Sequence, residues 1–283
     1  LSDKKIPFQP AVCPPDQTSG ESPQYLHSAP RAIRVSMPDP SIHPASSCPF
    51  CVGNEFMTPP EVYRLGEGEP DTPGWMARVV PNKYPITDIH EVIIHGPSCS
   101  DDIEKLPVDH VAQILRVYRN RFRVHMSHGH VMIFCNHGVQ AGASLKHPHS
   151  QLVVVPRQIT LDALSREPIA NIVEESEKFI SYCPEFSQWP LETWIVPKIP
   201  SGTFADLHGE DLQALAPMLS GTLRRMEKAM AQPNTPISKK STDPFVYNYY
   251  ISHSDHWFIR ITPRLIHRAG FELGTGLSVN ILD

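Results

Sequence analysis

The sequence predicts an α+β fold of two similar units, each an antiparallel sheet with a packed helix, and a proline-rich N-terminal arm before them. Three observations lead to this prediction. The 30 prolines among the 283 residues are concentrated in residues 1–85. A strand-like segment, a long amphipathic segment and two further strand-like segments then follow one another. The same order recurs in the second half of the chain, which is typical of an internal repeat.

The arm, residues 1–85, is expected to be extended and rich in turns. Proline lacks the amide proton that a helix or a central strand requires, so regular elements should be short there. Within the arm, short β-segments are expected at residues 61–65 and 76–80. The arm also carries a Cys-x-x-Cys pair, which is taken up below.

The first unit begins with residues 91–95 (EVIIH), which are typical of a strand. Residues 108–126 carry apolar side chains at helical spacing, and residues 130–135 and 150–155 again predict strands. A polar loop at residues 136–146, with two glycines and a serine, joins the last two strands. This order predicts a sheet with one helix packed on it.

The second unit repeats the order of the first. Residues 149–156 (HSQLVVVP) and 256–263 (HWFIRITP) both begin with His and end with Pro. We therefore expect two domains, residues 1–157 and 158–283, of which only the first is catalytic, because HPHSQ is replaced by SDHWF in the second. The acidic residues Glu174, Glu175 and Glu177 are expected on an exposed helix face. The strand-helix-strand-strand order of the second unit is expected at residues 192–196, 207–231, 245–251 and 257–261.

Composition excludes several classes of protein. Lys plus Arg is 25 and Asp plus Glu is 30, so the net charge of −5 argues against a binder of duplex nucleic acid. A hydrophobic content of 40% suits a folded globule, and the apolar runs are too short to span a membrane. The six cysteines are scattered, and residues 1–15 contain no apolar stretch typical of a secretory signal. We therefore expect a cytoplasmic protein with reduced cysteines.

The motif His147-Pro148-His149-Ser150-Gln151 is the most informative feature of the sequence. Side chains alternate along a strand, so His147, His149 and Gln151 are expected to project from one face. Three polar side chains on one face of an apolar segment need partners, which points to a functional site.

Two kinds of chemistry would use these residues. One is a metal site that takes both imidazoles as ligands. The other is nucleophilic attack by a neutral imidazole on phosphorus, which gives a phosphoramidate and divides one displacement into two. For attack, one ring nitrogen must be unprotonated, which a backbone carbonyl can enforce by accepting the other N–H. Gln151 would then donate to a phosphoryl oxygen, and Ser144 in the preceding loop could be a second neutral donor.

Cys48-Pro-Phe-Cys51 has the two-residue spacing of a zinc knuckle, whose turn directs both thiolates at one ion. The same spacing also occurs in redox proteins. The sequence has no second Cys-x-x-Cys, so a tetrahedral site would need two ligands from distant positions.

Taken together, HPHSQ after a Gly/Ser loop, CPFC upstream and two tandem α+β units resemble the galactose-1-phosphate uridylyltransferase family, the nucleotidyl-transferring branch of the histidine triad superfamily. The resemblance covers about residues 31–280. It implies two tandem histidine-triad-like units, a homodimer, and transfer of an NMP group through a covalent nucleotidyl-histidine. The substrates it implies are a nucleotide sugar with a sugar 1-phosphate or inorganic phosphate. The segments 256–263 and 270–276 resemble most the members that move adenylyl groups.

The resemblance also implies roles for individual residues. His149 would be the nucleophile, and Gln151 would bind the phosphoryl oxygens. The remaining positions match residues that contact substrate: Asn136 and Ser144 at the phosphates, Asn82 at the nucleotide, Arg31 and Arg34 at the phosphoryl group, and Phe271 and Glu272 at the sugar, with Phe271 in place of the usual Tyr.

A structural zinc ion is implied by the same resemblance. Its ligands would be Cys48, Cys51, His147 and a residue after the strand at 91–95, for which Cys99 is the first choice and His95 the rival. Some members hold iron in the second unit through a His-x-His pair, but this chain has Arg260 and Thr262 there, so no second metal is expected. The alternatives are a nucleotide or nucleotide-sugar hydrolase of the same superfamily and a non-catalytic nucleotide-binding or zinc-binding protein.

Overall fold

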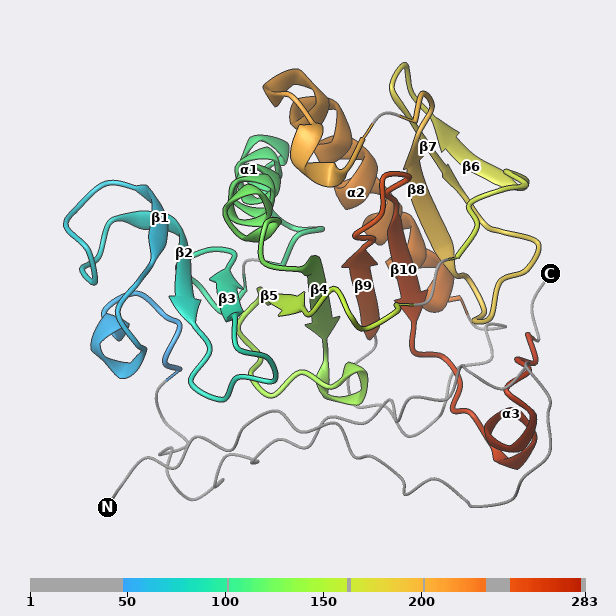
Figure 1. Cartoon of the computed structure of the whole chain (residues 1–283), viewed down its shortest axis with the longest axis horizontal. Coiled ribbons are helices and arrows are strands. Elements are labelled where there is room, and N and C mark those ends of the chain that lie inside the picture. The colour runs from blue at the N-terminus through green and yellow to red at the C-terminus, as the bar shows by residue number, and fades with distance from the viewer. Residues whose placement is uncertain (1–47, 101, 162–163, 201, 233–244, 281–283) are drawn as a thin grey trace.

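The computed structural model describes residues 48–100, 102–161, 164–200, 202–232 and 245–280. Its ten strands form one antiparallel sheet in the order β1-β2-β3-β5-β4-β9-β10-β8-β7-β6 (Figure 1). The strands are β1 Tyr63–Gly66, β2 Trp75–Pro81, β3 His90–Ile94, β4 His130–His137, β5 His149–Val155, β6 Ile172–Glu175, β7 Phe179–Tyr182, β8 Thr193–Pro197, β9 Tyr247–Ile251 and β10 Ile259–Pro263.

Three helices and three short 3₁₀ segments complete the described elements. They are α1 Val108–His125, α2 Gly209–Met230, α3 Gly270–Thr275, η2 Glu55–Met57, η3 Val139–Ala141 and η4 Phe204–Asp206. No helix in the described part of the chain is long and apolar enough to cross a membrane. The predicted α+β fold with an antiparallel sheet is confirmed, and most predicted segments lie within two residues of the observed ones.

The order of the strands is the same when it is counted from either edge of the sheet. One half runs β1-β2-β3-β5-β4, the other β6-β7-β8-β10-β9, and each half has one long helix between its third and fourth strands in chain order. The expectation of a separate sheet in each unit is wrong, because β4 pairs with β9, as in Asn136 with Asn248. The pairing leaves neither strand with an unpaired edge.

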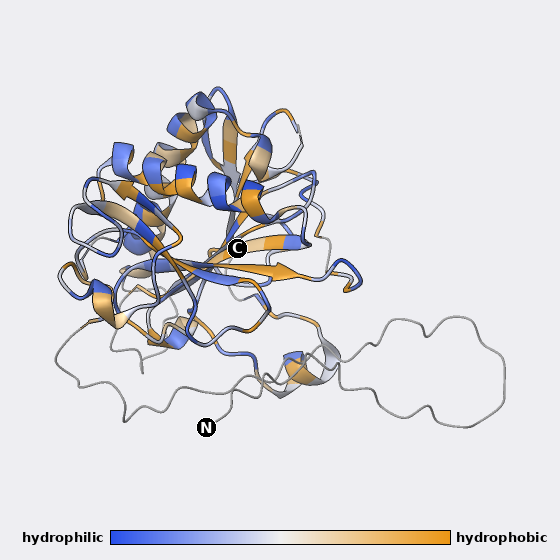
Figure 2. Cartoon of the chain, turned by 60° about the vertical axis from the view of Figure 1, so that its left-hand side comes forward, coloured by the Kyte–Doolittle hydropathy of each residue, from blue (hydrophilic) through white to orange (hydrophobic). Residues whose placement is uncertain are grey.

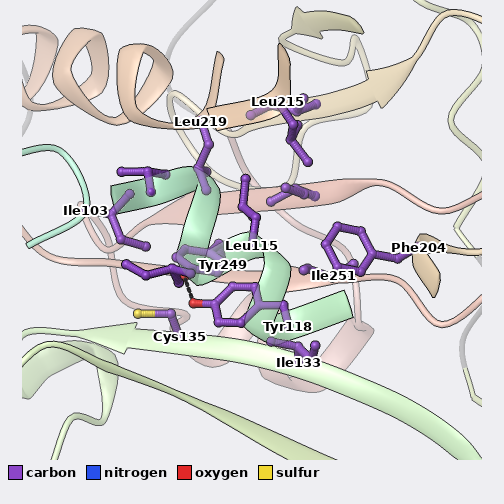
Figure 3. Packing of buried hydrophobic residues seen from close by; sticks show 14 of the residues in the cluster. Ile103, Leu115, Tyr118, Ile133, Cys135, Phe204, Leu215, Leu219, Tyr249 and Ile251 are labelled. Carbon is purple, nitrogen blue, oxygen red and sulfur yellow. Dashed lines mark hydrogen bonds between the residues drawn. The ribbon is translucent and has the colours of Figure 1, made fainter. Parts of the chain in front are cut away.

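One face of this sheet is covered by α1 and α2. Along α1 the buried positions include Val111, Leu115, Tyr118 and Phe122, which lie on one side of a helix. Figure 3 shows Leu115 and Tyr118 of α1 in the same cluster as Leu219 of α2. In Figure 2, hydrophobic and hydrophilic residues alternate along both helices, and hydrophobic residues recur along the strands. We call the opposite face, which α1 and α2 do not cover, the open side of the sheet.

Two segments differ from the sequence-based expectation. Residues 174–177 form part of the β6–β7 hairpin and its turn instead of an exposed helix. The hairpin is held by β7 pairing with β8 and by ion pairs of Glu174 with Arg225 and of Glu175 with Lys198, which are tertiary contacts that no local pattern predicts. The short helix α3 was not expected. Residues 1–47, most of the predicted arm, lie outside the described residues and include Arg31 and Arg34.

Candidate active site and metal centre

The two faces of β5 carry two different polar groups. On the helix face, Ser150 Oγ lies 2.5 Å from Tyr118 Oη and 3.1 Å from Tyr249 Oη. The oxygens of Tyr118 and Tyr249, which Figure 3 labels, are 2.7 Å apart. His95 Nε2 is also 2.9 Å from Ser150 Oγ. This buried network holds β5 against α1 and β9. Because His95 belongs to this network, it is not part of the Cys and His cluster described below.

His149 begins β5 and faces the open side of the sheet. Its ring is buried, and Nδ1 donates a hydrogen bond to the carbonyl oxygen of His147 at 2.7 Å. Because Nδ1 keeps its proton, the neutral ring has its free electron pair on Nε2. Burial lowers the pKa of His149. Phe50 packs edge-on against the ring at 5.4 Å between centroids and holds it in this orientation.

His147 lies just before β5, and Phe50 packs edge-on against its ring as well as against the ring of His149, at 6.0 and 5.4 Å between centroids. The strand begins at His149, since the preceding Pro148 has no amide proton to pair with a neighbouring strand. The His147 ring turns toward the cysteines of the Cys-x-x-Cys pair. The motif thus supplies one imidazole to each of two sites.

Gln151 lies on the same face as His149, and its amide is oriented by His90 of β3. The amide proton of Ile86 donates to His90 Nδ1 at 3.1 Å, so the neutral ring must carry its proton on Nε2. His90 Nε2 then donates to Gln151 Oε1 at 2.8 Å, and Asn82 Nδ2 approaches the same oxygen at 3.4 Å. With Oε1 occupied, the amino group of Gln151 is the end left to donate to a ligand.

Asn136 lies at the end of β4, one position beyond the Cys135–Ser150 pair that joins β4 to β5. Asn248 Nδ2 donates to Asn136 Oδ1 at 2.8 Å and to the Ala141 carbonyl at 2.8 Å, which ties the strand to the loop before β5. Asn136 and His149 line one small cavity of about 20 Å³, room for about one water molecule. In this loop Gly142 has φ of 88°, a conformation that favours glycine.

The structure does not bring all the predicted substrate residues together. Ser144 is exposed in the loop that leads to β5. Phe271 and Glu272 lie on α3, which stands apart from β5 (Figure 1). Phe271 is exposed, and Glu272 accepts a hydrogen bond from the amide of Ala269 at 3.0 Å. Among the described members of the predicted set, Asn82, Asn136, His149 and Gln151 gather on one face.

The predicted metal ligands do gather. Ligand atoms of Cys48, Cys51, Cys99 and His147 all lie within 4.8 Å of one another. His147 Nδ1 is 3.5, 3.6 and 3.4 Å from the three sulfurs in that order, and Cys51 Sγ is 3.2 Å from Cys99 Sγ. Zinc bonds of about 2.0–2.3 Å in a tetrahedron place neighbouring ligand atoms about 3.4–3.8 Å apart. The three nitrogen–sulfur distances match those around a tetrahedral ion, and the sulfurs of Cys51 and Cys99 lie closer together than that.

The chemistry of the four ligands fits zinc as well. His147 Nε2 donates to the Gly96 carbonyl at 2.8 Å, so Nδ1 is unprotonated and can coordinate. Burial and the neighbouring thiols of Cys51 and Cys48 raise the pKa of Cys99 to about 12, so three thiolates can coexist there only beside a cation. Cys99 rather than His95 is the fourth member of this cluster.

In the second half of the sheet, Arg260 is held by a carboxylate. Its Nε and Nη2 donate to the two oxygens of Glu192 at 2.7 and 2.9 Å, and both residues are buried. Trp194 Nε1 also donates to Glu192 at 2.7 Å. Position 260 is therefore engaged in an ion pair.

Comparisons with known proteins agree with this geometry. A family model described as the N-terminal domain of DUF4931, a domain of unknown function, matches residues 31–158. ADP-glucose phosphorylase of Arabidopsis thaliana is 30% identical over 83% of this chain and 78% of its own length. Galactose-1-phosphate uridylyltransferase of Thermotoga maritima is 23% identical over 83% of this chain and 85% of its own length. The solved structure of the Arabidopsis ADP-glucose phosphorylase with bound ADP-glucose has 25% identity and a TM-score of 0.69 over 85% of this chain and 88% of that chain. The resemblance seen in HPHSQ and CPFC is confirmed, and the chain belongs to the family of galactose-1-phosphate uridylyltransferase and ADP-glucose phosphorylase.

Proposed function

We propose that this protein is a nucleotidyltransferase that moves an NMP group between a nucleoside diphosphate sugar and a sugar 1-phosphate or inorganic phosphate. The names of its relatives, an ADP-glucose phosphorylase and a galactose-1-phosphate uridylyltransferase, support this proposal. The single observation that carries the proposal is the hydrogen bond from His149 Nδ1 to the His147 carbonyl. It leaves Nε2 as a free nucleophile on the open face of the sheet.

The reaction proceeds by two displacements at the α-phosphorus. In the first, a bond forms between His149 Nε2 and the α-phosphorus, the bond to the bridging oxygen breaks, and sugar 1-phosphate leaves with the electron pair. In the second, an oxygen of the acceptor phosphate bonds to the same phosphorus and the bond to Nε2 breaks. The amino group of Gln151 donates to a non-bridging oxygen, where charge stabilisation is most of the catalysis.

The other predicted residues are assigned supporting roles. Asn136 and Ser144 bind the phosphates from the β4–β5 loop, and Asn82 binds the nucleotide. Arg31 and Arg34 bind the phosphoryl group with their planar guanidinium groups. Phe271 and Glu272 bind the sugar. Their distance from β5 within one chain supports a homodimer in which α3 serves the partner's site.

Cys48, Cys51, Cys99 and His147 would hold one structural zinc ion. Four protein ligands leave no open position on the metal, so its role is to fix the knuckle beside the strand that presents His149. Thiolate ligands require reduced cysteines, which supports a cytoplasmic location. The mirrored strand order supports two tandem histidine-triad-like units, with the boundary at residue 157 between β5 and β6.

An isotope-exchange experiment separates this function from its alternatives. With ADP-glucose or UDP-glucose and labelled glucose 1-phosphate as the only substrates, the proposed enzyme incorporates label into the nucleotide sugar. A hydrolase instead accumulates NMP, and a non-catalytic binding protein gives neither product. Loss of exchange in His149→Asn is expected, and exchange at the wild-type rate in that variant overturns the nucleophile assignment.

A further inference from the structure

A second cavity lies beyond the site at His149, between the end of β10 and the segment before β8. Its volume is about 470 Å³, within the range of small-molecule sites. The residues that line it are polar and basic for the most part: Gln140, Gln188, Trp189, Arg260, Arg264, Ile266, His267 and Arg268. A cavity with this lining attracts anions.

The positive charge of two of these arginines is not neutralised within the described part of the chain. Arg260 is not one of these two, because Glu192 pairs with it through both oxygens. Arg264 and Arg268 have no ion pair with a described carboxylate. Arg264 Nε donates to Asn248 Oδ1 at 2.5 Å, and Arg268 Nη2 donates to Gln188 Oε1 at 3.2 Å, both neutral acceptors.

Both guanidinium groups lie against the ring of Trp189. The central carbons of Arg264 and Arg268 lie 4.8 and 5.3 Å from the centre of the Trp189 ring. The aromatic ring holds both side chains in place by cation–π contact but does not cancel their charge. Burial and the nearby Arg268 lower the pKa of Arg264, as expected when two like charges share a site. An anion between them would relieve this repulsion.

The cavity is connected to the site at His149. The amide of Asn248 accepts from Arg264 and donates to Asn136, so it joins the cavity to the end of β4. Asn248 on β9 is two strands from His149 on β5, which corresponds to about 10 Å across the sheet. A sugar that carries a phosphoryl group at each end can reach across such a distance, whereas one phosphate cannot be in both places.

We propose that Arg264 and Arg268 form a second anion-binding site, which takes a phosphoryl group beside Asn248, on the side away from Asn136 and His149. The planar guanidinium groups and Gln188 would contact its oxygens, and Trp189 keeps the arginines in position. The phosphoryl group is either the distal phosphate of a bisphosphorylated sugar bound at His149 or a free phosphate ion.

The binding test uses the full chain, inorganic phosphate as the probe and tryptophan fluorescence as the readout, with potassium chloride at matched ionic strength as the reference. Phosphate gives a saturable signal that is lost in Trp189→Phe and kept in His149→Asn. Arg264→Gln and Arg268→Gln each raise the Kd at least tenfold. Arg157→Gln removes an exposed arginine elsewhere and leaves the Kd unchanged. An unchanged Kd in both pocket variants, or loss of the signal in His149→Asn, overturns the proposal.

A second measurement identifies the source of the phosphoryl group and rests on the proposed function. The NMP acceptors compared are glucose 1-phosphate and glucose 1,6-bisphosphate. A tenfold lower kcat/KM for the bisphosphate alone in Arg264→Gln assigns the site to the substrate, which is the result expected from its distance to His149. Equal kcat/KM values for both acceptors in wild type and variant assign it to free phosphate. Because the binding test needs no turnover, an inactive protein overturns only the proposed function.

Discussion

His90 Nε2 donates a hydrogen bond to Gln151 Oε1 at 2.8 Å, and this contact determines which end of the Gln151 amide faces the open side of the sheet. The direction follows from the backbone, because the amide proton of Ile86 occupies His90 Nδ1. Burial lowers the pKa of His90, which keeps the ring neutral, as this arrangement requires. His90 is therefore a positioning residue that acts through Gln151.

Replacement of His90 by Phe frees the Gln151 amide to rotate. We expect kcat for nucleotidyl transfer to fall about 10- to 100-fold, while KM for the nucleotide sugar stays within about threefold, because the lost hydrogen bond matters most in the transition state. His90→Gln can still donate to Gln151 Oε1 and recovers most of kcat. His130→Phe, on neighbouring β4 and packed against His253, is the matched control and keeps kcat. A wild-type kcat in His90→Phe contradicts the positioning role.

Removal of a thiol from the proposed zinc site should empty it. The protein is expected to contain about one zinc per chain, and Cys99→Ala to contain almost none, as measured by elemental analysis. Cys99→His keeps the metal, because imidazole is an equally good zinc ligand. Cys183→Ala, which lies outside the cluster, is the control. Full zinc content in Cys99→Ala would show that Cys99 is not a ligand.

The buried pair of Asp102 and His137 predicts a pH dependence of stability. Burial would raise the pKa of Asp102, but hydrogen bonds from His137 and Lys105 lower it to about 2. Burial would lower the pKa of His137, but Asp102 raises it. Asp102 therefore stabilises the fold fully above its unfolded pKa of about 4 and loses this effect as the pH falls toward 2. His137 contributes below about pH 6.5 and loses its effect as the pH rises through its raised folded pKa.

Asp102→Asn should lower the free energy of unfolding by about 2 kcal/mol at pH 6, as measured by urea denaturation. The difference from wild type should shrink below pH 4 and again when His137 loses its proton. Asp255→Asn, which changes an exposed carboxylate, serves as the control and costs less than about 0.5 kcal/mol. A difference that stays constant between pH 3 and pH 9 contradicts the pairing.

Glu192 supports Arg260 inside the second half of the sheet. Glu192→Gln leaves the Arg260 charge buried without its carboxylate, and we expect a loss of about 3 kcal/mol in the free energy of unfolding. The double variant Glu192→Gln/Arg260→Met removes that charge and should be more stable than the single variant. If single and double variants unfold at the same urea concentration, the pair is not coupled.

Much of the fold follows from local patterns in the sequence. The helical spacing of apolar residues at 108–126 predicts α1. The apolar run after His149 predicts β5 in the same way. The β6–β7 hairpin was assigned to a helix, since its acidic residues find their partners on α2 and after β8. Such partners are not visible from spacing alone.

The residues of the site were likewise predictable only where a local motif contains them. HPHSQ and CPFC predicted the residues at the centre of both clusters. His90 was missed because its role depends on the pairing of β3 with β5, which places it beside Gln151. The Arg264 cavity was missed because Trp189 reaches it from a distant part of the chain. The only signal in the sequence was that several basic residues follow β10. Their spacing matches no known motif, so it did not predict a site.

The central claim is that His149 bonds to phosphorus during turnover, and the mass of the protein tests it most directly. The protein is mixed with ADP-glucose or UDP-glucose without an acceptor, and its intact mass and the mass of the peptide that contains His149 are measured. We expect an acid-labile increase equal to one AMP or UMP on that peptide, absent in His149→Asn and removed by inorganic phosphate or glucose 1-phosphate. Consumption of the nucleotide sugar with no such increase at any time point contradicts the account.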